Sequence, residues 1–521
     1  MALSPFVVPA TADDFAAARR RGMSRRAMWA AVIAVACGGL YAASENVILP
    51  VVLLVFIAGV IVLWNAPKAA LYVAFGTACL IELADFNQSD SLTDRVPFFW
   101  NINTILQTYA HVNFKAVPLN LFECVLITAG ACALFRAVFT QTARVRVGPL
   151  MGPICAYLFF VVLALFVGMG SGGDFKIALS EVRAQFYFAL VYLMVVNCVR
   201  ERRHVDQFLW MTAVLIAAKG ALYTFRRYVT LGGAPLPDGG VGSHEEAFFF
   251  DCYFALLLTL AFCGSHPKLR NFMLLALPLV ILGDLATNRR AGTAAMAVIL
   301  PVLLLAAYRG LPRRRRFVSI LSLSLIVGFA VYFPVFRNSN SILALPAHAL
   351  QSQFAPDERD RSSNLYRDAE NIDQMTTIQS APWGFGYGKR FIHAVPIADI
   401  SGIYELWDVI PHNQILWIWM RTGTMGFFAF WIMISAILVY CAQVFRDDTL
   451  SLDLRLIGLY ALLVVGCQLM FGLLDLQMVN FRDMIFTSAW VGIATRVRFL
   501  QRTPGSTDSR HTDRDTWGSS R

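Results

Sequence analysis

Long apolar runs, each of about 17–23 residues, recur along the chain and are separated by polar stretches. A run of this length crosses a bilayer as a helix, and a helix pairs its backbone polar groups within its own segment, as lipid requires. The pattern therefore predicts an all-α polytopic integral membrane protein with about fourteen transmembrane helices. The expected spans are 27–44, 47–64, 68–84, 119–139, 150–170, 184–199, 206–225, 247–264, 271–287, 291–308, 317–336, 423–445, 456–474 and 484–499.

Basic residues occupy alternate loops between these spans. Arginines precede the first span, and dense clusters lie around 144–146, 200–203, 268–270 and 309–316. Cytoplasmic loops carry the excess of Lys and Arg, so both termini are expected in the cytoplasm. A shift of one span would place half of these clusters on the outer face, which the same rule disfavours.

One outer loop is far longer than the others and divides the chain. The expected organisation is a cytoplasmic tail at 1–26, helices 1–11 at 27–336, a large periplasmic loop at 337–422, helices 12–14 at 423–499, and a polar cytoplasmic tail at 500–521. Loops of this length are usually functional or disordered. This loop contains structural signals, so we expect it to be ordered.

The first of these signals is a helix in RSSNLYRDAENIDQMTTIQSAP, where apolar residues from Leu365 to Ile378 recur at helical spacing. Ser362 or Ser363 is expected to cap its start, and Pro382 to mark its end. Aromatic residues and glycines then alternate in WGFGYGKR. Glycine permits tight turns and close approach to a ligand, so this stretch predicts a turn that either binds sugar rings or packs at the membrane interface.

Composition supports the membrane class and excludes several functions. Apolar residues make up 57% of the chain and charged residues 15%, whereas a soluble domain carries roughly 25% charged residues. The ten cysteines lie in apolar runs, which argues against a disulfide framework. The net charge of +10 is spread over many loops, so positive-inside orientation explains it better than nucleic-acid binding. The chain contains no GxxxxGK[ST], HExxH or CxxC pattern, so neither ATP hydrolysis nor a zinc site is supported.

Three arginines are expected on the outer face, against the positive-inside trend. Arg183 lies at the mouth of the sixth span, and Arg289 and Arg290 form the tip of a tight hairpin in LATNRRAG. Guanidinium groups match phosphate oxygens bidentately, so these residues are candidates for binding phosphate. The alternative is that each arginine snorkels to the lipid headgroups.

His412 and Asn413 face the same side, at the start of the apolar helix in PHNQILWIWMRTGTMG. The positive end of a helix disfavours the imidazolium ion, so His412 could accept a proton as a general base; a structural role is the alternative.

Further candidates for binding substrate are the loop residues Arg367, Trp383 and Tyr387, together with Lys219, which lies inside an apolar run and either has a function or snorkels. Finally, the acidic stretch SHEEAFFFD at 243–251 is interpreted as a solvated loop end, with a divalent-cation site as the alternative.

Three of these stretches resemble the bacterial O-antigen ligase and polysaccharide polymerase superfamily. TNRRAGTAAM is similar to the family's arginine hairpin, with Arg290 at the arginine position and Arg289 where serine is usual. The loop helix with its glycine-aromatic turn and the histidine–asparagine helix PHNQILWIWMRTGTMG also resemble family motifs. Together these stretches span roughly residues 280–430, while the first third of the chain is similar only as generic membrane helices.

The resemblance implies a membrane-embedded, GT-C-like glycosyltransferase of the bacterial inner membrane that needs no metal or cofactor. Its donor would be an oligosaccharide on undecaprenyl pyrophosphate, presented at the periplasmic face. Arg290, Arg289 and Arg183 would bind the pyrophosphate, and His412 would deprotonate the acceptor hydroxyl, with inversion at the anomeric carbon. The remaining implied partners are a glycan or lipid acceptor, membrane lipids and a chain-length regulator.

Five functions are compared with this pattern. A polymerase of exopolysaccharide or O-antigen is favoured over a ligase that transfers glycan to lipid A-core, because the chain has many spans and a long outer loop. A protein O-oligosaccharyltransferase is a further alternative. A transporter or flippase would place charged residues near the bilayer midplane and often shows inverted repeats, neither of which the sequence shows. A glycan-binding scaffold without chemistry is the last possibility.

The expected orientation has a direct test. A cysteine in Ser401→Cys should react with a membrane-impermeant thiol reagent in intact spheroplasts, and a cysteine in Ser506→Cys should not. Labelling at position 506 with protection at 401 would invert the topology and remove the common outer face of the candidate residues.

Overall fold

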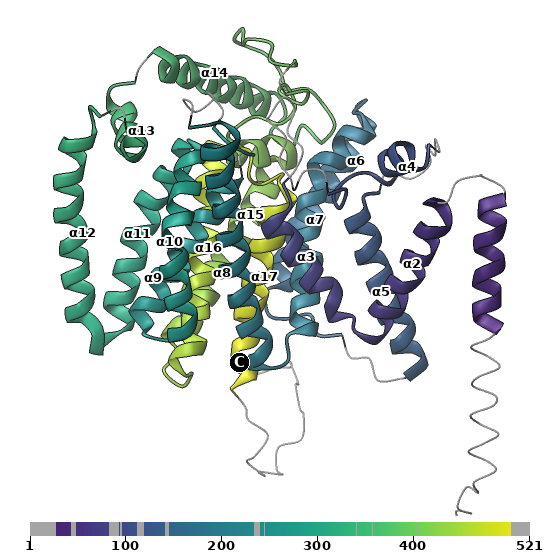
Figure 1. The fold of residues 1–521 in the computed structure, drawn as a ribbon. Coiled ribbons are helices and arrows are strands. Elements are labelled where there is room, and N and C mark those ends of the chain that lie inside the picture. Colours follow the sequence, from purple (N-terminus) through teal and green to yellow (C-terminus); the bar gives the residue numbers. More distant parts are fainter. Residues whose placement is uncertain are drawn as a thin grey trace, which may run out of the picture. The chain divides into compact units, whose positions relative to one another are not determined.

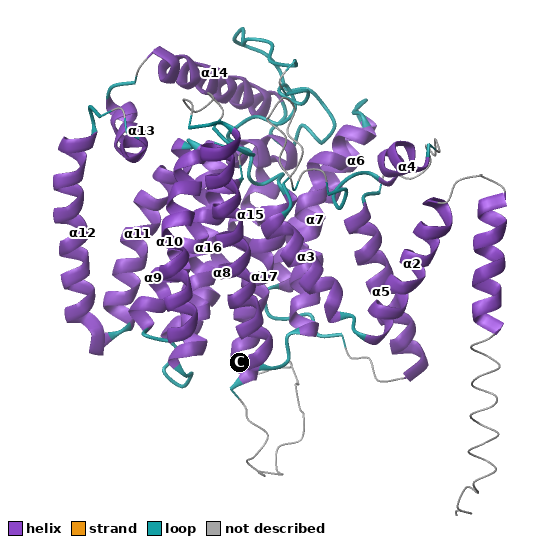
Figure 2. Ribbon diagram, in the orientation of Figure 1, coloured by secondary structure: helices purple, strands orange, loops and turns teal. Residues whose placement is uncertain are grey.

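The computed structural model describes residues 28–42, 48–82, 93, 96–111, 119–140, 145–233, 240–243, 245–339, 341–356, 358–402 and 404–501. The expected tails at 1–26 and 502–521, and His244 of the acidic stretch, lie outside the described residues. Across the described ranges the regular structure is helical, and the only β-type pairing is an isolated bridge between Asn101 and Asn120 (Figure 2). The protein is therefore an all-helical polytopic membrane protein.

Two compact units divide the chain: residues 1–70 with 97–143, and residues 71–96 with 144–521. In unit 1 the described helices are Met28–Ala42, α2 (Ile48–Asn65), α4 (Ile102–Ala110) and α5 (Leu121–Thr140). Helices α2 and α5 pack together, and Arg136 donates a hydrogen bond to the carbonyl oxygen of Trp64.

The helices of unit 2 begin with α3 (Lys68–Leu80), whose first three residues belong to unit 1. The others are α6 (Met151–Gly170), α7 (Phe175–Cys198), α8 (Arg202–Phe225), η1 (Arg226–Thr230), α9 (Glu246–Cys263), α10 (Pro267–Thr287), α11 (Arg290–Gly310), η2 (Pro312–Arg314), α12 (Arg315–Phe336), η3 (Ile342–Ala344), α13 (Leu345–Phe354), α14 (Glu358–Ser380), α15 (Gln414–Arg446), α16 (Leu452–Leu474) and α17 (Phe481–Leu500). The closest packing is between α17 and α7, α10 and α8, and α15 and α16, while α13 and α14 lie at one end of these helices (Figure 1).

Helices occupy all fourteen positions where spans are expected, but fewer of them qualify by length and composition. Among the described helices nine are long and apolar enough to cross a membrane, or ten if α2 and α3 form one broken span. Helix 28–42 is too short for this criterion, and α17 carries Arg482, Asp483, Arg496 and Arg498 near its ends. The span expected at 423–445 begins earlier, because α15 starts at Gln414 and bends at Gly423.

The predicted basic loops of unit 2 meet at one end of its helices. Arg496 donates to the carbonyl oxygen of Val199, Arg455 to that of Gly310, and Arg314 to that of Ala261. Loops that the charge pattern assigns to one side of the membrane thus contact one another across the sequence. The alternation expected within this unit is consistent with its packing.

A turn from the long loop inserts between α6 and α15 and is held there by glycines. Gly386 has φ 84°, and a Cβ at this position would overlap the backbone of Gly168 on α6. Gly423, at the bend of α15, has φ 71°, and a Cβ there would overlap the carbonyl group of Trp383. Only glycine allows these backbones to approach so closely in this conformation. The predicted glycine-aromatic turn is therefore packed into the helices.

The buried side chain of Arg421 forms hydrogen bonds to the backbone of this turn. Its Nε lies 2.7 Å from Oε1 of Glu181 on α7, and both side chains are fully buried. Its terminal nitrogens donate to the carbonyl oxygens of Gly386, Lys389 and Val409 at 2.8–2.9 Å. Trp417 Nε1 and the Gly388 amide also donate to Glu181. Both the guanidinium and the carboxylate of this pair thus have further hydrogen-bond partners, which a buried ion pair needs in order to be stable.

Removing one partner of this pair should lower the temperature at which the protein unfolds. Arg421→Met leaves Glu181 as an uncompensated buried charge, which costs about 3–5 kcal/mol. The measurement is thermal unfolding of the purified protein in detergent, with Arg498→Met as the matched control because Arg498 pairs with Asp447 in an exposed position. Combining Arg421→Met with Glu181→Leu should recover part of the loss. Equal unfolding temperatures for Arg421→Met and Arg498→Met would contradict this account.

Candidate functional site

Helix α14 lies at one end of the helices of unit 2 (Figure 1) and buries a polar face. Its Glu370, Asp373, Gln374 and Thr377 are buried, whereas Leu365 and Ile372 are exposed. The helix predicted from the spacing of apolar residues is present, but it starts at Glu358, so neither Ser362 nor Ser363 caps it. It ends at Ser380, shortly before Pro382, as expected. Its polar side contacts both His412 and Arg290.

His412 is held by this helix. Its Nδ1 lies 2.8 Å from Oε2 of Glu370, and its backbone amide donates to the same oxygen at 3.3 Å. Glu370 is almost fully buried, while the His412 side chain keeps 20% of its surface exposed. A neutral imidazole that donates from Nδ1 to this oxygen presents the lone pair of Nε2 on the opposite side of the ring. This is the arrangement of a histidine base oriented by an acid.

The neighbours of His412 strengthen its position. Asn413 is the N-cap of α15: its side chain accepts from the Leu416 amide, and its Nδ2 donates to Asn371 of α14. Tyr366 lies edge-on to the His412 ring, with 6.0 Å between ring centroids. Burial, and then the Glu370 carboxylate, raise the pKa of the Tyr366 hydroxyl, so this group stays protonated near neutral pH. A phenol donor and an imidazole acceptor therefore lie side by side.

The arginine hairpin forms a second site. Asn288 ends α10 with φ 52°, Arg289 caps α11, and Arg290 is the first residue of that helix. Arg290 Nη1 lies 3.1 Å from Asp360 Oδ1, and its Nη2 donates to Ser363 Oγ at 3.4 Å. A helix N-terminus that carries two arginines is a strong anion-binding element.

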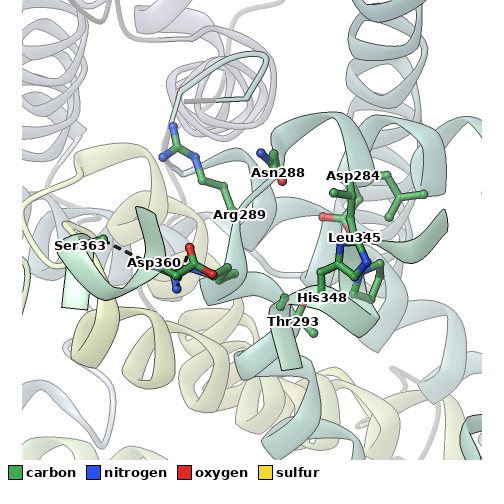
Figure 3. Close-up of a pocket in the computed structure, with 12 residues that line it drawn as sticks. Asp284, Asn288, Arg289, Thr293, Leu345, His348, Asp360 and Ser363 are labelled. Atoms are coloured by element: carbon green, nitrogen blue, oxygen red, sulfur yellow. Dashed lines mark hydrogen bonds and ion pairs between the residues drawn. The ribbon is translucent and has the colours of Figure 1, made fainter. Parts of the chain in front are cut away.

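A pocket of about 260 Å³ opens beside this hairpin. Figure 3 shows Arg289 and Asp360 on one side of the pocket and Asp284 and His348 on the other. The remaining lining residues are Leu285, Asn288, Arg290, Thr293, Leu345, Pro346, Ala349 and Ser363. The pocket has room for a pyrophosphate group, and Arg289 and Arg290 are among the residues that line it.

One helix connects these two sites. Ser363, at Arg290, and Glu370, at His412, are seven residues apart on α14. Seven residues rise about 10 Å and return to nearly the same side of a helix. This spacing suits a ligand whose phosphates lie at the hairpin and whose reacting carbon lies near the histidine. Arg367 is half-buried between the two contact points, on the same side of α14.

Arg183 lies on α7, two residues after Glu181 of the buried ion pair, and is half-buried. The pair between Glu181 and Arg421 therefore joins the helix of Arg183 to the helix that His412 precedes. The role of Arg183 stays a prediction.

The two aromatic candidates have opposite environments. Trp383 is 76% exposed at the end of the loop helix, so its ring is accessible to a sugar. Tyr387 is fully buried, packs against Trp417 and donates to Gln185 at 3.3 Å. A sugar needs an accessible ring face, so Tyr387 serves the packing of the turn.

Lys219 neither snorkels nor faces either site. It is fully buried, 3.2 Å from Glu82 and 3.1 Å from Glu246. Arg482 lies 2.6 Å from Glu246 and 3.4 Å from Glu245, so the expectation of a solvated loop end at 243–251 is wrong. These charges pair across α3, α8, α9 and α17, and their positions are structural. Among the described residues no group of three or more His, Cys, Asp or Glu side chains is arranged to hold a metal ion.

Several partners in these sites escaped the sequence analysis. Asp360, Ser363 and Glu370 recur on α14 at helical spacing, and this polar periodicity was a usable signal beside the apolar one. Arg421 is a charge inside an apolar run, which usually indicates a function or a buried partner. Asp284 is likewise a charge inside an apolar run, whereas His348 carries no such signal, because the fold of the loop brings α13 to the hairpin.

The fold and these sites define a polytopic membrane protein with a histidine–carboxylate pair and an arginine-lined pocket. Residues 273–431 match the Wzy_C family, described as O-Antigen ligase, and this part of the chain is an O-antigen ligase family domain. The match runs from α10 into α15 and includes Arg289, Arg290, α14 and His412. No curated protein matches the chain. The family implies an enzyme that transfers glycans, of the ligase or polymerase type.

Proposed function

We propose that the protein is an inner-membrane glycosyltransferase that polymerises oligosaccharide repeat units carried on undecaprenyl pyrophosphate, at the periplasmic face. The observation that carries this proposal is the connection within the family domain: α14 contacts both Arg290 and His412. Lipid-linked glycans contain both groups that these sites suit, a pyrophosphate and an anomeric carbon next to it.

The reaction needs a base and a site for the leaving group. The acceptor hydroxyl attacks the anomeric carbon of the donor while its proton passes to Nε2 of His412. The bond from this carbon to the pyrophosphate oxygen breaks, and the lipid pyrophosphate leaves with the electron pair. Glu370 stabilises the imidazolium ion that forms, as the acid of a catalytic triad does. Attack opposite the leaving group inverts the anomeric centre, and no metal is required.

The arginines act on the leaving group. Negative charge grows on the pyrophosphate as the bond breaks, so positioned guanidinium groups stabilise the transition state more than the ground state. Arg290 and Arg289 line the pocket that would hold it, and Arg183 is assigned to the same group. Arg367 and the exposed Trp383 are placed to contact the glycan from the outer loop.

The alternative transferases differ from a polymerase in the acceptor of the glycan. A polymerase extends one lipid-linked repeat with another, a ligase uses lipid A-core, and a protein O-oligosaccharyltransferase uses a serine or threonine. The long outer loop with its ordered helix favours a growing glycan as the acceptor, and a chain-length regulator is then an expected partner. A flippase would need neither His412 nor its orienting carboxylate.

The acceptor can be identified directly. Purified protein given lipid-linked repeat alone should produce a polymer ladder in the presence of EDTA. Transfer that occurs only after lipid A-core is added would instead establish a ligase.

The base can be tested at His412 and at Glu370. His412→Ala and His412→Gln should both abolish polymer formation, since a general base contributes about 10²–10⁴-fold in rate and neither side chain can take its place. Glu370→Gln should lower kcat, leave KM for the donor nearly unchanged, and alter the pH profile of kcat, because the amide no longer stabilises the imidazolium ion. Glu370→Asp should recover part of the rate. Activity of His412→Gln near that of the wild type would reduce His412 to a structural residue.

The hairpin arginine has its own test, which separates charge from geometry. Arg290→Ala should lower the rate about 10²–10³-fold, the loss typical for one donor to a developing anion. Arg290→Lys keeps the charge but loses the planar fork, so it should be impaired less than Arg290→Ala, and Arg289→Ala should be milder than Arg290→Ala. Rates are measured on polymer formation in vitro at equal protein levels. Full activity of Arg290→Lys and Arg290→Ala would refute the pyrophosphate assignment.

A further inference from the structure

Asp360 occupies the place at Arg290 that a phosphate would take. Both terminal nitrogens of Arg290 are engaged by α14, Nη1 by Asp360 at 3.1 Å and Nη2 by Ser363 at 3.4 Å. Both partners of the ion pair are largely buried, with 23% and 18% of their side chains exposed. A bidentate grip on phosphate uses two parallel N–H groups of one guanidinium. Asp360 and Ser363 therefore each hold one terminal nitrogen of Arg290, and a phosphate that binds this pair of nitrogens competes with them.

The charges around the pocket lead to the same conclusion. Arg289 and Arg290 both line the pocket, and Asp360 is in an ion pair with Arg290. A phosphate beside this carboxylate would meet a like charge at contact distance, which is unfavourable where water is partly excluded.

We propose that Asp360 is the resident counter-ion of Arg290, and that phosphate must displace it to bind. This inference rests on the proposed function for the identity of the donor and adds a residue that sets the affinity of the pocket. The cost of displacing Asp360 is the same for every ligand. A ligand with one phosphate offsets it with one set of contacts, and a pyrophosphate with two. Because this cost is common to both, Asp360 lowers the affinity for both kinds of ligand by the same factor; single phosphates, which make fewer contacts, then leave the pocket largely unoccupied, whereas a pyrophosphate-linked donor still binds.

Binding of inorganic pyrophosphate to the full-length protein in detergent tests the inference without catalysis. Titration calorimetry should show Asp360→Asn binding pyrophosphate about tenfold more tightly than the wild type, because the amide keeps the shape but not the competing charge. Asp368→Asn is the matched control, since it removes one charge from an exposed position on the same helix and should leave the affinity unchanged. Arg290→Ala should abolish binding. Asp360→Ser provides a second variant with the same expected direction if Asp360→Asn folds poorly.

The outcomes separate this inference from the proposed function. Unchanged or weaker binding by Asp360→Asn and Asp360→Ser, with binding lost in Arg290→Ala, would overturn the role of Asp360 and leave the anion pocket in place. Wild-type binding by Arg290→Ala would overturn both the pocket assignment and this inference. Tighter binding by the Asp360 variants supports the inference even if the protein forms no polymer, because the measurement requires no transfer.

Discussion

The buried ion pair between Arg421 and Glu181 is the contact on which the rest of the site depends. It joins α7 to α15 and holds the glycine turn against both, with each remaining donor of Arg421 bound to a carbonyl oxygen of the loop. An ion pair removed from water is stable only when its partners are fully engaged, and here they are. The start of α15, and with it His412, is fixed relative to α7 and the loop for this reason.

From this anchored turn the chain runs back to α14, a helix whose polar residues are inside and whose apolar residues are partly outside. Three of its four buried polar side chains have partners in other segments: Glu370 binds His412, Asp373 binds His393 and the amides of 394 and 395, and Thr377 binds the amide of Ile392. A polar helix can therefore act as a rigid bridge across the outer end of the bundle. It sets the separation between the histidine and the arginine hairpin.

The two ends of this bridge differ in their chemistry. At His412 the carboxylate of Glu370 is almost fully buried and binds both the ring and the backbone, which suits a permanent orienting contact. At Arg290 the carboxylate of Asp360 shares a solvent-accessible pocket with other charges, which suits an exchangeable contact. A carboxylate thus stands at each end of the bridge, and we propose that it orients a base at one end and competes with a ligand at the other.

Hydropathy determined that the protein spans a membrane and where its helices lie, because both properties depend on local sequence. The distribution of basic residues indicated which loops of unit 2 share an end, because that property depends on the average charge of each loop. The sequence also placed His412 before a helix and Arg290 in a tight hairpin. It did not indicate that Glu370 meets His412 across 42 residues, that Lys219 is paired, or that Tyr387 is buried. Those outcomes depend on contacts between segments distant in the chain, where a polar side chain is buried only if the fold supplies its partner.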